Sequence, residues 1–188
     1  MRQKLFITIR GIAICWCMIT STALYADQND PRLEELFASL KTETDMFEAN
    51  SIANAIWQIW FEHEDPMANS LMTRGVQQME SYSISAALQT FDRLIALKPD
   101  FAEAWNRRAT IYYQMGEYDA SLRDIDEVLK LEPFHFGALS GRGLVYMGKQ
   151  DYFMARGAFL TLLEVYPAMP GVKENILMLE EVLRNGAI

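Results

Sequence analysis

Two histidines, His63 and His135, are the side chains best suited to acid–base or metal chemistry in this chain. His63 lies among Glu62, Glu64 and Asp65, which makes it a weak candidate for contact with a metal ion. His135 is far away in the sequence, and a zinc site needs a tighter cluster of histidine, cysteine and carboxylate ligands. We therefore interpret His63 as a helix-end residue in an acidic turn, and we predict no metal ion and no cofactor.

The sequence also lacks the patterns of nucleophilic and nucleotide-binding enzymes. Its two cysteines, Cys15 and Cys17, lie near the amino terminus, and it has neither a Gly-x-Ser-x-Gly element nor a phosphate-binding glycine loop. The Gly-Arg-Gly run at 141–143 is not a nucleotide motif, because no strand precedes it. We predict a protein without catalytic residues.

Three arginines recur at one spacing, since Arg108 lies midway in the sequence between Arg74 and Arg142. On equivalent faces of stacked helices they would form a basic ladder for an acidic or carboxylate-bearing partner. The alternative is that they pair with acidic residues of adjacent helices, and we favour this interpretation because the chain has 25 acidic and 17 basic residues.

The elements that would position these arginines are short helices joined by turns. In the stretch 102–133, Trp105, Ala109 and Tyr112 share one helix face, because they are spaced by four and three residues. Gly116 marks a turn, and Pro133 ends a second helix. The stretch therefore predicts a helical hairpin.

The hairpin repeats with a period of about 34 residues, which is typical of a solenoid. A small residue recurs where two helices must approach closely, and a large residue recurs where a core must be filled. The small positions are Ala53, Ala87, Ser121 and Ala155, with Gly75, Ala109 and Gly143; the large ones are Trp57, Phe91, Ile125 and Phe159; prolines recur at Pro99, Pro133 and Pro167.

The stretch 102–133 resembles the consensus of the tetratricopeptide repeat (TPR) family, and the copy at 136–167 is nearly as similar. The copy at 68–99 keeps the small, large and proline positions but has lost the turn glycine. The consensus matches in the middle copy are Trp105, Tyr112, Gly116, Tyr118, Ser121, Leu129 and Pro133. The resemblance implies an all-α fold, an α–α superhelix of three repeats with a degenerate N-terminal helical pair and a C-terminal capping helix.

The corresponding domain boundaries follow from the register. We expect Trp57 and Trp60, in the degenerate N-terminal unit, to pack under the next repeat rather than bind a ligand. The predicted units are a signal peptide at 1–26, an N-terminal degenerate helical repeat or cap at 27–67, repeats at 68–101, 102–135 and 136–169, and a capping helix at 170–188.

The amino terminus has the pattern of a secretory signal peptide: basic residues, an apolar run from Gly11 to Ile19, and then small residues. Cleavage is predicted after Ala26, or after Ala23, and the alternative is a retained amphipathic anchor. Removal of 1–26 would change the net charge from −8 to −11. This acidity disfavours nucleic acid and anionic membranes as partners. We predict export to the periplasm of a Gram-negative bacterium, or secretion, with no stable membrane anchor after cleavage.

The resemblance further implies a concave groove, lined by the first helix of each repeat, that receives an extended or helical peptide. Family members that bind chaperone tails grip a terminal carboxylate with lysine, asparagine and arginine side chains, but of the five matching positions here only Arg107 could act in this way. We therefore predict a groove without a carboxylate clamp. Its predicted lining is Met72, Val76, Met79, Asn106, Thr110, Tyr113, Ser140, Leu144 and Met147.

These observations predict a non-catalytic interaction module that binds a protein or peptide, not a small-molecule substrate, in its groove. The alternative is a structural subunit of an envelope assembly or secretion complex that is held through the outer faces of its repeats.

Overall fold

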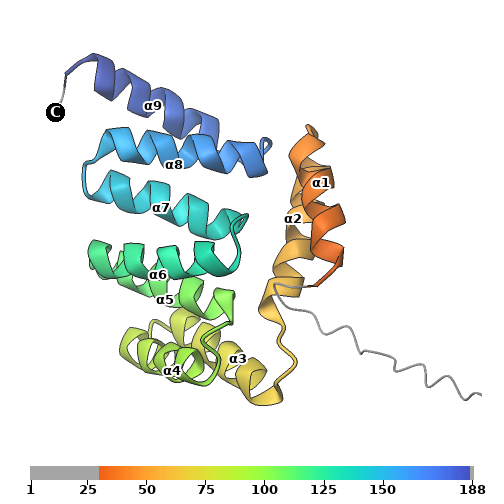
Figure 1. Cartoon of the computed structure of the whole chain (residues 1–188). Helices are drawn as coiled ribbons and strands as arrows, with labels where there is room; N and C mark the ends of the chain where they lie inside the picture. Colours follow the sequence, from red (N-terminus) through yellow and green to blue (C-terminus); the bar gives the residue numbers. More distant parts are fainter. Residues whose placement is uncertain (1–29, 187–188) are drawn as a thin grey trace, which may run out of the picture.

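The computed structural model describes residues 30–186, and every regular element in this range is an α-helix (Figure 1). The all-α class predicted from the sequence is confirmed, whereas the predicted signal peptide at 1–26 lies outside the described residues. The helices are α1 (Arg32–Thr42), α2 (Met46–Phe61), α3 (Pro66–Glu80), α4 (Ile84–Leu97), α5 (Ala102–Gln114), α6 (Tyr118–Leu131), α7 (Phe136–Gly148), α8 (Tyr152–Val165) and α9 (Val172–Arg184).

Three hairpins, α3–α4, α5–α6 and α7–α8, stack in sequence order, and α9 packs on α8 (Figure 1). The second helix of each hairpin ends two residues before a proline, at Leu97, Leu131 and Val165. Proline disfavours helical geometry in the residue that precedes it, so the recurring prolines set the length of each hairpin.

Within each hairpin, one small and one large side chain face each other. A Cβ atom added to Gly75 would lie 2.5 Å from the Phe91 ring, and one added to Gly143 would lie 2.5 Å from the Phe159 ring. The equivalent pair of the middle hairpin is Ala109 and Ile125, which are buried in one cluster. Glycine therefore packs against phenylalanine in two hairpins, and alanine packs against isoleucine in the third. The combined volume of each pair stays similar in all three hairpins.

The turns of the three hairpins share one left-handed residue. Gly116 has φ +77°, and the residues one repeat period before and after it, Tyr82 and Gln150, have φ +57° and +61°. The loss of the turn glycine in the first copy therefore did not change the turn, but it left a tyrosine in a conformation that costs L-residues about 1 kcal/mol.

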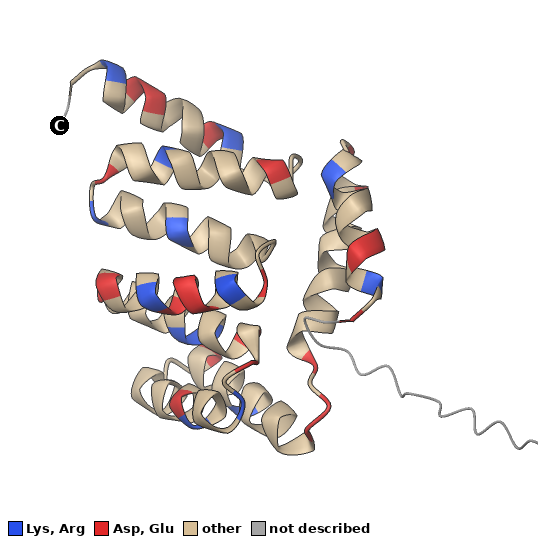
Figure 2. Cartoon of the chain, viewed as in Figure 1, with Lys and Arg blue, Asp and Glu red and all other residues tan. Residues whose placement is uncertain are grey.

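The N-terminal hairpin α1–α2 does not continue the stack. Figure 1 shows it standing across the ends of the other helices, where α1 contacts α8 and α2 contacts α5. An acidic segment that contains Glu62, Glu64 and Asp65 joins it to α3 (Figure 2). The prediction that Trp57 and Trp60 pack under the next repeat is thus wrong, because both rings pack against Phe136 at the start of α7.

The small–large pairing can be tested by exchanging one pair for another. We expect Gly143→Ala to lower the free energy of unfolding by about 1–3 kcal/mol, because its Cβ overlaps the Phe159 ring. The double variant Gly143→Ala/Phe159→Ile recreates the pair of the middle hairpin and should lose less than the sum of the two single variants. Urea denaturation of the four proteins measures this coupling, and additive losses would contradict the pairing.

The strained turn provides a second prediction. Tyr82 is 88% exposed, so its replacement removes little packing. We expect Tyr82→Gly to raise the free energy of unfolding by about 1 kcal/mol, because glycine adopts positive φ without a steric penalty. The control Tyr82→Ala keeps a Cβ atom and should leave stability unchanged, and an equal response of the two variants in urea denaturation would refute the strain.

Candidate functional site

A cleft of about 430 Å³ lies between α2 and the inner faces of α5 and α7. Four residues of α2, spaced as one helix face, form one wall: Asn50, Ala53, Asn54 and Trp57. The side chains that line the cleft are apolar, amide or hydroxyl groups, and none is charged. Such a surface can contact apolar side chains and form hydrogen bonds with a peptide backbone, but it offers no ion pair.

Five of the nine predicted groove residues line this cleft. Asn106, Thr110 and Tyr113 come from α5, and Ser140 and Leu144 come from α7. They lie one helical turn apart along neighbouring first helices, as the register predicted. Asn106 is only 7% exposed, however, and its amide donates a hydrogen bond to Glu103 at 2.8 Å, so it is a supporting residue.

The other four predicted groove residues lie elsewhere. Met72 is 1% exposed in the core between α3 and α4, and Val76 and Met79 pack against the same core. Met147 packs against the large core cluster around α8. The prediction is wrong for Met72, which is buried, whereas Val76, Met79 and Met147 are half-buried and lie outside the lining of this cleft.

The contribution of α2 to the cleft was not predicted from the sequence. The hydroxyl of Tyr166 donates a hydrogen bond to Asn50 Oδ1 at 2.6 Å and ties α2 to the end of α8. The available signal was the polar pair Asn50 and Asn54 on the same face as Trp57, since two amides on an otherwise apolar face indicate a wall that is not fully buried.

A buried polar cluster fixes the floor behind the cleft. The Glu103 carboxylate accepts hydrogen bonds from Arg107 Nε at 2.5 Å, Asn106 Nδ2 at 2.8 Å and His135 Nε2 at 3.1 Å. The Ala138 amide donates to His135 Nδ1 at 3.1 Å, so this network assigns the imidazole proton to Nε2. The cluster therefore joins α5 to the first turn of α7, with the Glu103 carboxylate fully buried and the Arg107 side chain partly exposed.

Aromatic rings of α2 cover this cluster. The Trp60 ring stacks on His135 with a centroid distance of 4.0 Å and an angle of 8°, and Trp57 meets Phe136 edge-on at 5.3 Å. The Arg107 guanidinium lies 4.6 Å from the centroid of the Phe61 ring. A Cβ atom on Gly137 would lie 2.6 Å from Trp57, so the glycine is what allows α2 to approach.

The other residues considered for chemistry have structural roles. The imidazole Nδ1 of His63 accepts a hydrogen bond from the Asp65 amide at 3.0 Å, and the Asn69 side chain bonds the backbone of His63. The interpretation of His63 as a helix-end residue is confirmed. Within residues 30–186, no group of three or more histidine, cysteine or acidic residues is placed to hold a metal ion.

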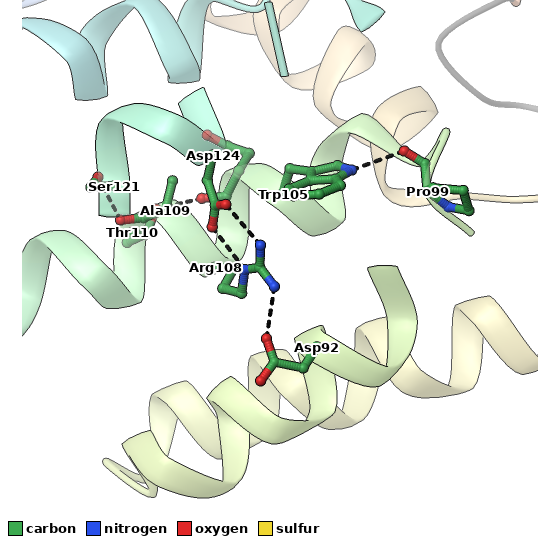
Figure 3. Close-up of polar contacts among 9 residues, drawn as sticks. Asp92, Pro99, Trp105, Arg108, Ala109, Thr110, Ser121 and Asp124 are labelled. Carbon is green, nitrogen blue, oxygen red and sulfur yellow. Dashed lines mark hydrogen bonds and ion pairs between the residues drawn. The ribbon is translucent and has the colours of Figure 1, made fainter. Parts of the chain in front are cut away.

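The arginines of the predicted ladder pair with acidic neighbours. Arg108 forms two hydrogen bonds of 2.8 Å with Asp124 and one of 2.7 Å with Asp92 (Figure 3). Because Asp92 belongs to α4, the bond to it connects the α3–α4 hairpin with the α5–α6 hairpin. Arg142 pairs with Asp126 at 2.6 Å. The bonds to Asp124 raise the pKa of Arg108 further, so its charge is fixed. The favoured interpretation therefore holds for Arg108 and Arg142, whereas Arg74 is exposed.

None of the helices in the described part of the chain is both long enough and apolar enough to cross a membrane.

The model of the tetratricopeptide repeat family matches residues 102–135. A TPR repeat-containing protein of Rhizobium etli is 42% identical over 152 residues, which cover 81% of this chain and 74% of that protein.

Solved structures show the same fold. The TPR domain of Sgt2 from Aspergillus fumigatus has a TM-score of 0.60 at 18% identity, over 65% of this chain and 83% of that domain. The second TPR domain of human RPAP3, in complex with an HSP70 peptide, has a TM-score of 0.57 at 20% identity, over 60% of this chain and 94% of that domain. These likenesses confirm the predicted α–α superhelix.

The contact between α2 and α7 can be tested with one added methyl group. We expect Gly137→Ala to lower the free energy of unfolding by about 1–3 kcal/mol and to speed hydrogen exchange in α2, because its Cβ collides with Trp57. The matched control is Gly141→Ala on the same helix, whose Cβ would meet only Ile125 at an ordinary 3.5 Å. Equal behaviour of the two variants would show that α2 does not rest on Gly137.

Proposed function

The chain belongs to the tetratricopeptide repeat family, and from this premise we propose that it is a non-catalytic module that binds a segment of another polypeptide in the cleft between α2, α5 and α7. The observation that carries the proposal is the lining of that cleft: Thr110, Tyr113, Ser140 and Leu144 combine hydroxyl groups with apolar surface and lie along two neighbouring helices. A partner segment could run along both helices and use one contact per turn.

The chemistry of the cleft restricts the partner. Because no lining side chain is charged, an ionised group of the partner would lose its hydration without gaining a counter-charge. We therefore expect an uncharged segment, in which apolar side chains contact Leu144 and Trp57 and backbone groups contact Thr110 and Asn54. The human RPAP3 domain that shares the fold is bound to an HSP70 peptide, which supports a polypeptide ligand. The uncharged lining distinguishes this cleft from a carboxylate clamp.

The place of action is the periplasm of a Gram-negative bacterium in this proposal. It is supported by the signal-peptide pattern of residues 1–26 and by the position of both cysteines, Cys15 and Cys17, within that segment. After cleavage, the protein would have no thiol to oxidise in an oxidising compartment.

A second candidate function is a structural subunit that is held through outer faces. The observation that favours it is the exposure of large apolar side chains on the last two helices, Phe153 of α8 at 70% and Leu177 and Met178 of α9 at 66% and 45%. Three exposed side chains of this size suit a contact with a neighbouring protein.

The two functions make different predictions for a crosslinking experiment. We expect Tyr113→Ala/Leu144→Ala to reduce capture of partner proteins in cells by about tenfold, because truncation of a central, well-packed contact residue costs about 2 kcal/mol or more. The matched variant Phe153→Ala/Leu177→Ala alters the outer face and should leave capture unchanged. Mass spectrometry of crosslinked partners provides the measurement, and circular dichroism checks that both variants fold. Loss of capture in the outer-face variant alone would support the structural subunit instead.

A further inference from the structure

A second cleft, of about 530 Å³, lies between α1 and the ends of α6 and α8, and we call it the α1–α8 cleft. Leu33 and Phe37 of α1, Val165 of α8 and Phe134 after α6 provide its apolar lining. Phe37 and Phe134 meet with a centroid distance of 5.6 Å, and Phe134 is 55% exposed. The cleft therefore offers aromatic surface that remains open to a ligand.

One carboxylate of this cleft is buried without an ion pair. Glu132 is 6% exposed, and no ion pair among residues 30–186 includes it. Its carboxylate accepts a hydrogen bond from the Phe134 amide at 3.2 Å. The indole N–H of Trp60 lies close enough to lower the pKa of Glu132, although the indole nitrogen is outside normal hydrogen-bond geometry. A carboxylate has room for about four hydrogen bonds, so Glu132 can accept further donors beside the Phe134 amide and the Trp60 indole.

The burial of Glu132 carries an energetic cost that the chain itself offsets only in part. Desolvation raises the pKa of Glu132, and this effect outweighs the hydrogen bond from the Phe134 amide, which lowers it. Asp30, a second acid of the cleft, shows the contrast: it is buried as well, but Arg32 bonds it at 2.7 and 2.8 Å and its pKa is lowered. Glu132 is thus the buried acid of this cleft that has no arginine or lysine paired with it.

The surroundings of Glu132 favour a positive charge in two further ways. Glu34 and Glu164 stand at the edge of the cleft and are exposed, whereas Lys41 is the single basic residue among those that line it. In addition, α6 ends at Leu131 and α8 ends at Val165, so the negative ends of two helix dipoles face the cleft. The positive end of the α1 dipole also lies at this cleft, where the Asp30 carboxylate accepts a hydrogen bond from the Arg32 amide and offsets it.

We propose that the α1–α8 cleft binds an arginine side chain that an apolar segment of a partner polypeptide presents, with the guanidinium paired to Glu132 and its plane against Phe134. Arginine fits better than lysine, because a guanidinium is less strongly hydrated, can pair with both carboxylate oxygens and stacks on aromatic rings. Leu33 and Phe37 then contact the apolar neighbours of that arginine. This site is separate from the cleft between α2, α5 and α7 and does not depend on its function.

The proposal can be tested by calorimetric titration of the purified protein, expressed as the full-length chain. The probe is acetyl-Ala-Leu-Arg-Leu-Ala-amide, and its control is the same peptide with citrulline, which has the shape of arginine without its charge. We expect the arginine peptide to bind and the citrulline peptide to bind at least about tenfold more weakly. Absence of binding, or equal binding of both peptides, would overturn the proposal.

Variants of the protein test whether the peptide binds in the α1–α8 cleft. Glu132→Gln keeps the size of the side chain, removes its charge and should weaken binding by at least about tenfold. The matched control is Glu127→Gln, a partly exposed acid of α6 that pairs with Lys130 and should bind like the wild type. If Glu132→Gln does not fold, Phe134→Ala removes an exposed ring instead and should also weaken binding. Unchanged affinity in these cleft variants, or loss of binding in Tyr113→Ala/Leu144→Ala, would place the peptide elsewhere and refute the assignment.

Discussion

The arrangement of this molecule depends on one buried carboxylate, that of Glu103. An uncompensated buried charge would cost several kcal/mol, so its neighbours must supply hydrogen bonds. Arg107 and Asn106 are the next residues on the same helix face, but His135 comes from the start of α7. The need to satisfy Glu103 therefore fixes the first turn of α7 against α5, and it holds the imidazole flat as a surface on which Trp60 can stack.

Because the N-terminal hairpin rests on that surface, it builds two clefts of different chemistry. Its second helix, α2, faces α5 and α7 and completes an uncharged cleft with Asn50 and Asn54. Its first helix, α1, faces the ends of α6 and α8 and completes a cleft that contains the unpaired carboxylate of Glu132. Neither cleft would exist if the hairpin continued the stack below α3. The departure from simple repetition is thus what gives the chain binding surfaces beyond those of its repeats.

The sequence predicted the repeats well because their determinants are local. Phe91 follows Gly75, and Phe159 follows Gly143, within half a repeat period, and the same spacing recurs in every hairpin. The position of α2 depends instead on Trp57 and Gly137, which lie more than two repeat periods apart and belong to no shared pattern. Periodicity shows that Trp57 lies on the apolar face of a helix, but it does not show which surface that face covers. The same limit explains Met72. The sequence correctly placed it on the first helix of its repeat, but the side chain points into the core instead of the groove.

The glycines of α7 show how this distant contact acts on the repeats. Gly137 admits Trp57, Gly143 admits Phe159, and Gly141 leaves open the space that becomes the floor of the cleft. Each glycine within a helix costs about 0.5–1 kcal/mol relative to alanine, so α7 is a weak helix by its own propensity. Its order must come from packing, on one side against Phe159 and on the other against Trp57. The third repeat and the wall formed by α2 therefore stabilise each other. A ligand that contacts both α2 and α7 would strengthen the packing between them.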